Sequence, residues 1–346
     1  MNESLLRQRV KTFILCFLAQ TATALPCFAS EDAKSVEVSD PTPQQPPANM
    51  YPSPLLSLQS QTGAFSQFAF LVDKSRRTLT VWQDSGDTIK LVGAWPTDIG
   101  EKKGDKLVEG DKRTPEGVYF FQTMMDGRKV DFSQYGVRIF TLDYPNYFDR
   151  LEKKTGNGIW FHAIPETKSL VRGSRGCVVV RNAVIEELAK FIELKRTPMV
   201  ISDAVEYVDL ETWRAHKKQY RDWIETWRSS WSSKDLDAYM NQYSEKFSGN
   251  GMNKSQWRAY KSNLNSRYEF IEIDLKDVQI FNQGPKIVFR FLQAYKSNQK
   301  EDFGSKILYA LKNGDRYEII GESWQKIGTQ ALGALNLKSD MQSRAN

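Results

Sequence analysis

The sequence changes character near Tyr207, and this change constrains the fold more than any other feature. Before it, short apolar runs alternate with turn residues, a pattern typical of β-strands. After it, Asp209 can cap a long helix, and the chain then returns to strand-like runs. The pattern predicts a mostly β domain over residues 63–205 and a separate α+β domain over residues 206–330.

The upstream domain is expected to contain several short strands and one helix. The expected strands are 68–72, 78–82, 117–121, 137–142, 159–161 and 178–180. Asn182 is expected to cap the helix, which places Ile185, Leu188 and Ile192 on one face.

The downstream domain is expected to begin with an aromatic-rich helix. Its large side chains recur at helical spacing, which indicates packing in a core rather than ligand binding: Trp213, Tyr220, Trp223, Ile224, Trp227 and Trp231. Ser233 is expected to cap a second helix. The strands expected to follow are 268–273, 277–281, 287–295, 307–311 and 316–320, the last two joined by an Asn313-Gly314 turn.

The first 29 residues have the pattern of a secretory signal peptide. Basic residues precede a short apolar stretch, and Cys27-Phe28-Ala29 fits a cleavage site. We therefore expect export to the periplasm. Residues 30–62 are rich in proline and are expected to form an exposed tether, and residues 331–346 a disordered tail.

The charge balance narrows the class of partner. Removal of the signal peptide leaves 45 basic against 41 acidic residues, a net charge of +4. This weak positive charge suits contact with anionic polymers of the cell envelope, and it gives no support for nucleic acid binding.

Cys177 is expected to be the only cysteine in the mature chain, and His162 is one of two histidines. A lone thiol in an exported protein has no partner for an intrachain disulfide, so it is either inert or reactive. Gly, Ser and Arg residues surround it rather than apolar ones, which favours a reactive thiol. A thiol and an imidazole within reach can attack an amide carbonyl and protonate the leaving amine.

The residues around the pair supply further candidates. Backbone N–H groups at Gly176 and Cys177 can stabilise an oxyanion, and Gly176 lets a carbonyl approach closely. Arg172, Arg175 and Arg181 are expected to favour the thiolate and to bind substrate carboxylates. For Arg172 and Arg181 a solvated surface position is an equal alternative.

No metal and no cofactor are expected. Two histidines and one cysteine, spread over two domains, do not make a usual zinc ligand set. His216 lies beside two lysines and is expected to be exposed. The sequence has no glycine-rich phosphate loop, and it lacks the Gly-x-Ser-x-Gly elbow of serine hydrolases.

The spacing of His162, Ser174, Gly176 and Cys177 resembles the active-site motif of the L,D-transpeptidases, which have a YkuD-type catalytic domain. Two upstream segments are also similar to that family: Leu71-Val72-Asp73-Lys74 and Thr114-Pro115-Glu116-Gly117.

The resemblance implies a β-sandwich with a few helices that acts on peptidoglycan stem peptides. It implies that Cys177 attacks the bond between the L-centre of meso-diaminopimelate and a terminal D-alanine, that His162 is the base, and that Ser174 and Gly176 shape the nucleophile turn.

Three departures from the family pattern leave the acyl acceptor open between water and an amine. Many members have a second histidine where this chain has Arg175, and glycine where Ala163 stands. Three valines separate Cys177 from Arg181, whereas a polar residue commonly follows the cysteine sooner. Ala163 and Arg175 are kept among the expected substrate-binding or oxyanion residues.

Residues 206–330 resemble an NTF2-like domain. A YkuD-type domain followed by such a tail resembles the L,D-carboxypeptidases that trim tetrapeptides to tripeptides in cell-shape control. The tail is then either a site for a glycan or protein ligand, or a purely structural or dimerising module, so a homodimer remains open.

Two alternatives to trimming remain. One is a transpeptidase that forms cross-links or attaches protein to peptidoglycan. The other is a non-catalytic envelope-binding protein, against which the intact pair of His162 and Cys177 argues, because a binding module needs neither residue.

Overall fold

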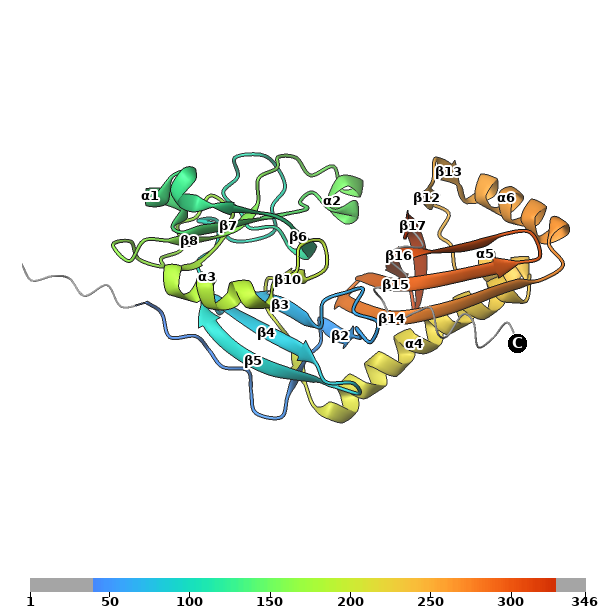
Figure 1. Ribbon diagram of the computed structural model, residues 1–346, viewed down its shortest axis with the longest axis horizontal. Coiled ribbons are helices and arrows are strands. Elements are labelled where there is room, and N and C mark those ends of the chain that lie inside the picture. The colour runs from blue at the N-terminus through green and yellow to red at the C-terminus, as the bar shows by residue number, and fades with distance from the viewer. Residues whose placement is uncertain (1–39, 328–346) are drawn as a thin grey trace, which may run out of the picture. The chain divides into compact units, whose positions relative to one another are not determined.

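The structure is a computed structural model that describes residues 40–327 (Figure 1). The predicted signal peptide and the predicted C-terminal tail lie outside the described residues. The described residues belong to a single compact unit. Within residues 40–327, no helix is both long enough and apolar enough to cross a membrane.

An eight-stranded sheet forms the first domain. Its spatial order is β5-β4-β3-β10-β6-β7-β8-β9. The strands are β3 (Phe68–Asp73), β4 (Thr78–Asp84), β5 (Ile89–Pro96), β6 (Gly117–Asp126), β7 (Arg138–Leu142), β8 (Trp160–Ile164), β9 (Val178–Arg181) and β10 (Pro198–Ser202). Most neighbours are antiparallel, but β3 and β10 pair in parallel, as do β8 and β9. The predicted mostly β domain is confirmed, although β5 and β10 were not predicted.

The sheet folds over itself around an aromatic core. Strands β3 and β8 have three strands between them, yet the ring centroids of Phe70 and Phe161 lie 5.9 Å apart. Phe121, on β6, contacts both rings at 5.2 and 5.9 Å. The pairing of β6 with β7 is irregular between Phe121 and Met124, which lets β6 serve both halves of the fold.

Short helices cover the connections of this domain. They are η1 (Gly127–Lys129), α1 (Phe132–Tyr135), α2 (Tyr147–Leu151), α3 (Asn182–Leu188) and η2 (Ala189–Phe191). The predicted cap of α3 is wrong, because Asn182 is its first residue and Arg181 is the N-cap. The Asn182 amide instead accepts a hydrogen bond from the N–H of Val137 at 2.9 Å.

The second domain begins with α4 (Leu210–Ser232), capped by Asp209 as predicted. The predicted aromatic stripe is buried apart from Trp223, which is half-buried and stacks on Phe289 at 4.9 Å. The second helix, α5 (Leu236–Met240), is capped by Asp235 and not by Ser233, which ends α4. A further helix, α6 (Lys254–Arg267), was not predicted.

A five-stranded antiparallel sheet packs against these helices, in the order β17-β16-β15-β14-β2. Its strands are β2 (Leu55–Leu58), β14 (Ile271–Gln283), β15 (Lys286–Ser297), β16 (Glu301–Asn313) and β17 (Arg316–Lys326). The two strands predicted at 268–273 and 277–281 are one strand, β14, with an irregularity after Lys276. Two small pairs complete the fold: β1 (Tyr51–Pro52) with β11 (Tyr207–Val208), and β12 (Ser248–Gly249) with β13 (Met252–Asn253).

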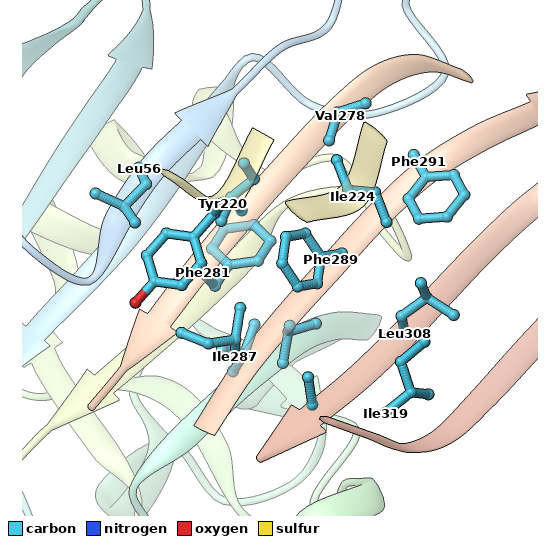
Figure 2. Close-up of a cluster of buried hydrophobic side chains, with 14 of the residues drawn as sticks. Leu56, Tyr220, Ile224, Val278, Phe281, Ile287, Phe289, Phe291, Leu308 and Ile319 are labelled. Atoms are coloured by element: carbon cyan, nitrogen blue, oxygen red, sulfur yellow. The ribbon is translucent and has the colours of Figure 1, made fainter. Parts of the chain in front are cut away.

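The predicted tether is wrong for residues 51–58. Strand β2 pairs with β14 and so adds the fifth strand to the sheet of the tail domain. Its Leu55 carbonyl accepts a hydrogen bond from Trp213 Nε1 at 2.9 Å, and Leu56 is fully buried near Tyr220 and Phe281 (Figure 2). The prolines that suggested a tether all precede this strand, and the last of them is Pro54.

Candidate active site

The structure brings Cys177 and His162 to one pocket. Strands β8 and β9 are parallel neighbours, with His162 opposite Val179, and Cys177 directly precedes β9. Both side chains line a pocket of about 540 Å³, together with Ser174 and Arg175. The two residues are fifteen positions apart in the sequence, and the parallel pairing of β8 with β9 brings them close together in space.

The turn before Cys177 is held by its own serine and by a neighbouring segment. Ser174 Oγ donates to the Cys177 carbonyl at 2.6 Å and accepts from the N–H of Gly176 at 3.1 Å. The backbone of Ser174 also bonds to Ile99 and Glu101. These bonds fix the backbone at the point where the thiol projects.

Gly176 adopts a conformation that other residues rarely take, with φ at +126°. A Cβ there would lie 2.8 Å from the carbonyl oxygen of Arg113. Both the backbone angle and the close approach therefore require glycine at this position.

His162 is buried and oriented by a backbone carbonyl. Its Nδ1 lies 2.8 Å from the carbonyl oxygen of Ala163, and its ring contacts Tyr135 edge-on at 5.1 Å between centroids. With Nδ1 donating to this carbonyl, Nε2 is left as the basic nitrogen. Burial lowers the pKa of His162 to about 4, so the imidazole is neutral at pH 7.

The thiol of Cys177 is also neutral at rest. Its Sγ lies 3.8 Å from the carbonyl oxygen of Gly158. Burial raises the pKa of Cys177 to about 11, although Arg175 and Lys106 act in the opposite direction. Of the three arginines, Arg175 favours the thiolate as predicted, but burial outweighs it. The pair suits proton transfer from thiol to imidazole during attack rather than a preformed ion pair.

The three predicted arginines occupy different places. Arg175 is exposed on the pocket lining, where its Nη2 lies 3.4 Å from Gln134 Oε1. Arg181 does not line the pocket: it pairs with Asp40 and donates to the carbonyls of Pro165 and Lys168. Arg172 and Ala163 are likewise absent from the lining, as is Gly176.

Sequence reasoning missed Asp98, which lines the pocket from the segment after β5. Its backbone pairs with Val179 in both directions, and its Oδ2 accepts from the N–H of Gly173 at 3.2 Å. Arg77 Nη2 lies 3.9 Å from its Oδ1. Burial raises the pKa of Asp98 to about 6. No local motif marks this residue, because strand pairing alone brings it beside the nucleophile turn.

Arg175 is the arginine placed to bind substrate. We expect Arg175→Ala to lower kcat/KM for a stem tetrapeptide about tenfold or more, mainly by raising KM, because the lost group would bind a carboxylate in both ground and transition states. Steady-state kinetics against wild type measure this. Arg172→Ala, outside the pocket lining, is the matched control. Equal effects of the two substitutions would remove Arg175 from the binding site.

In the part of the chain that the structure describes, no three His, Cys, Asp or Glu side chains gather closely enough to hold a metal ion. His216 is half-buried on α4, less exposed than predicted, and lies in the other domain.

Both domains match known family models. Residues 67–201 match the L,D-transpeptidase catalytic domain, YkuD, and residues 209–323 match the Cds6 C-terminal NTF2-like domain. None of the curated proteins matches the chain. The predicted resemblance and the predicted fold class are confirmed by the two family models.

Solved structures resemble the whole described architecture. Bd1075 of Bdellovibrio bacteriovorus is 42% identical, with 81% of this chain and 100% of that chain covered and a TM-score of 0.76. The helical cell shape determining protein Pgp2 of Campylobacter jejuni is 24% identical, with 79% and 93% covered and a TM-score of 0.60. The likeness to Pgp2 concerns the fold alone.

Proposed function

Because this chain belongs to the L,D-transpeptidase family, whose YkuD domain acts on peptidoglycan stem peptides, we propose that it trims stem tetrapeptides to tripeptides as an L,D-carboxypeptidase. The observation that carries the proposal is the joint placement of Cys177 and His162 in one pocket, with His162 on β8 and Cys177 directly before its parallel neighbour β9.

The proposed reaction has two steps. In the first, His162 Nε2 takes the thiol proton while Cys177 Sγ attacks the carbonyl carbon between meso-diaminopimelate and D-alanine. The imidazolium then protonates the leaving amine, and D-alanine departs. In the second, His162 takes a proton from water, which attacks the thioester and returns the thiol.

The oxyanion of each step needs donors near Cys177. The N–H of Gly176 is bonded to Ser174 Oγ, so it is not the free donor that the sequence suggested. The N–H of Cys177 itself is our candidate donor, since the bonds of Ser174 hold the turn in place. Arg175 is proposed to bind a substrate carboxylate at the pocket edge.

Water is proposed as the acceptor because hydrolysis requires fewer positioned groups in the site than transfer to an amine does. An acceptor amine must be held about 3–3.5 Å from the acyl carbon in an attack geometry. Water needs only an open path and a base, which His162 supplies. A transpeptidase remains the alternative, because both acceptors use the same acyl-enzyme.

Product analysis separates the two activities. We expect purified protein to convert a disaccharide tetrapeptide mainly to tripeptide and free D-alanine, with or without an excess of a different D-amino acid. Mass spectrometry of the products measures the partition. A dominant exchange product or cross-linked dimer, with little tripeptide, would assign the transferase activity. A chain that releases nothing and acquires no β-lactam adduct would fit the envelope-binding alternative.

The cellular role is proposed from the same resemblance. Pgp2 is described as a helical cell shape determining protein. We propose that this chain is exported to the periplasm and that stem trimming there contributes to cell shape. Detection of the mature protein in a periplasmic extract tests the location.

A further inference from the structure

Two loops form one wall of the active-site pocket, and a buried lysine joins them. Lys106, Glu109 and Gly110 come from the first loop, and residues 156–158 from the second. The loops are bonded directly: the N–H of Thr155 donates to the Leu107 carbonyl at 3.0 Å, and Thr155 Oγ1 accepts from the N–H of Glu109 at 3.0 Å. The two loops are therefore linked to each other along the wall.

Lys154 lies behind this wall and is almost completely buried. Its ammonium group contacts three carboxylates: Asp105, which begins the first loop, Asp149 at 2.9 Å, and Glu152 at 3.1 Å. Burial alone would lower the pKa of Lys154, but the bonds to Asp105 and Asp149 raise it above its ordinary value. The amine is thus charged and fixed between both loops.

Gly158, in the second loop, connects the wall to the reacting sulfur atom. The Gly158 carbonyl lies beside the Cys177 thiol, 3.8 Å from Sγ, and only two residues separate Gly158 from Thr155. A shift of the second loop would therefore change the position and surroundings of the thiol. Displacements of about 1 Å at a reacting group can cost about a hundredfold in rate.

The same segment is attached to the tail domain. Helix α2 lies just before it, and Tyr147 Oη donates to the Ile320 carbonyl on β17 at 2.7 Å. The Tyr147 ring also stacks on Tyr309 of β16 at 4.5 Å. Glu152, the C-cap of α2, pairs with Lys286, the first residue of β15, and with Lys154. Tail, helix and pocket wall form one continuous set of contacts.

We propose that Lys154 is a positioning residue for Cys177, and that the tail domain acts on catalysis through Lys286, Glu152 and Lys154. This inference rests on the proposed function for its assay but not for its geometry. The tail would then set the activity of the catalytic domain, in addition to any ligand that it binds.

The test uses the protein from residue 30 onward, in which Cys177 is the single cysteine, and counts active sites by titration with iodoacetamide. We expect Lys286→Met to lower kcat per titrated site about threefold or more, with KM within about twofold. Lys312→Met is the matched control, because Lys312 is an exposed lysine at the same end of the neighbouring strand. We expect Lys154→Met to lower kcat per site about a hundredfold.

A double-mutant cycle with Glu152→Gln identifies the route. We expect the double variant Glu152→Gln, Lys286→Met to be no slower than the slower single variant, because both remove one link. The proposal would be overturned if the double variant lost kcat by the product of the two single losses. It would also be overturned if Lys286→Met and Lys312→Met had the same kcat per site. A lower melting temperature with unchanged kcat per site would also overturn it, since that is the result of a merely structural role.

Two outcomes need a second measurement. If Lys154→Met does not fold, Lys286→Met and the cycle decide alone. If wild type releases no D-alanine, the proposed function fails, and the rate of iodoacetamide alkylation at Cys177 decides the coupling. The coupling would be supported if Lys286→Met changed the alkylation rate about twofold or more while Lys312→Met did not. Equal alkylation rates in the two variants would refute the coupling.

Discussion

Cys177→Ala is expected to lower kcat for D-alanine release from a tetrapeptide by at least about a thousandfold. The substitution removes the atom that forms the acyl-enzyme, so no covalent route remains. The fold should persist, because the thiol makes one long hydrogen-bond contact, to the Gly158 carbonyl, and packs at the edge of a small apolar cluster, whereas backbone bonds and Ser174 hold the turn. Coupled assay of free D-alanine measures the loss, and the melting temperature verifies the fold.

His162→Ala is the companion variant. The two groups act as a unit, so the double variant should be about as slow as either single one. Mass spectrometry should show a β-lactam adduct on wild type and none on Cys177→Ala. Tripeptide formation at near wild-type rate by Cys177→Ala would exclude this thiol as the nucleophile.

The sequence predicts those parts of the fold that depend on local pattern. Alternating apolar runs located most strands of the first domain, and helical spacing located the buried face of α4. Cap positions were less reliable, because a polar side chain such as Asn182 has other partners in the folded protein. Its amide binds Val137, 45 residues away, and no local rule reveals that.

The site was predictable to the same extent. Cys177 and His162 stand out because the chain has so few residues of either kind. Asp98 and Gly158 do not stand out, since ordinary strand and loop residues become site residues only through pairing with distant segments. The sequence shows the neighbouring Arg175, which lowers the pKa of Cys177 as predicted, but it does not show the burial that raises this pKa by more.

Strand β2 shows the same limit at the level of a whole element. Its four residues directly follow a proline-rich stretch, which predicts irregular chain rather than a strand. Their partner, β14, lies more than 200 residues further along the chain, so only the folded structure shows the pairing. Along the sequence, the whole catalytic domain is therefore inserted between β2 and β14, two strands that pair in the tail sheet.

Leu56→Asp is expected to lower the free energy of unfolding by at least about 3 kcal/mol, because it leaves a cavity and places a carboxylate among apolar side chains. Leu56 is fully buried, in the cluster that contains Tyr220, Phe281 and Ile287 (Figure 2). Urea unfolding followed by tryptophan fluorescence reports the change, since most of the stripe on α4 is buried in the same domain.

The matched control is Gln45→Asp, in the exposed proline-rich part of the same segment. It adds the same charge outside the core and should change stability by no more than about 0.5 kcal/mol. Equal, small effects of both substitutions would mean that residues 51–58 are a tether in solution. A large difference would mean that the tail sheet is complete only with a strand from before the catalytic domain. Cutting the chain between the domains would then remove β2, one of the two strands that pair with β14, so the two domains must be studied as one protein.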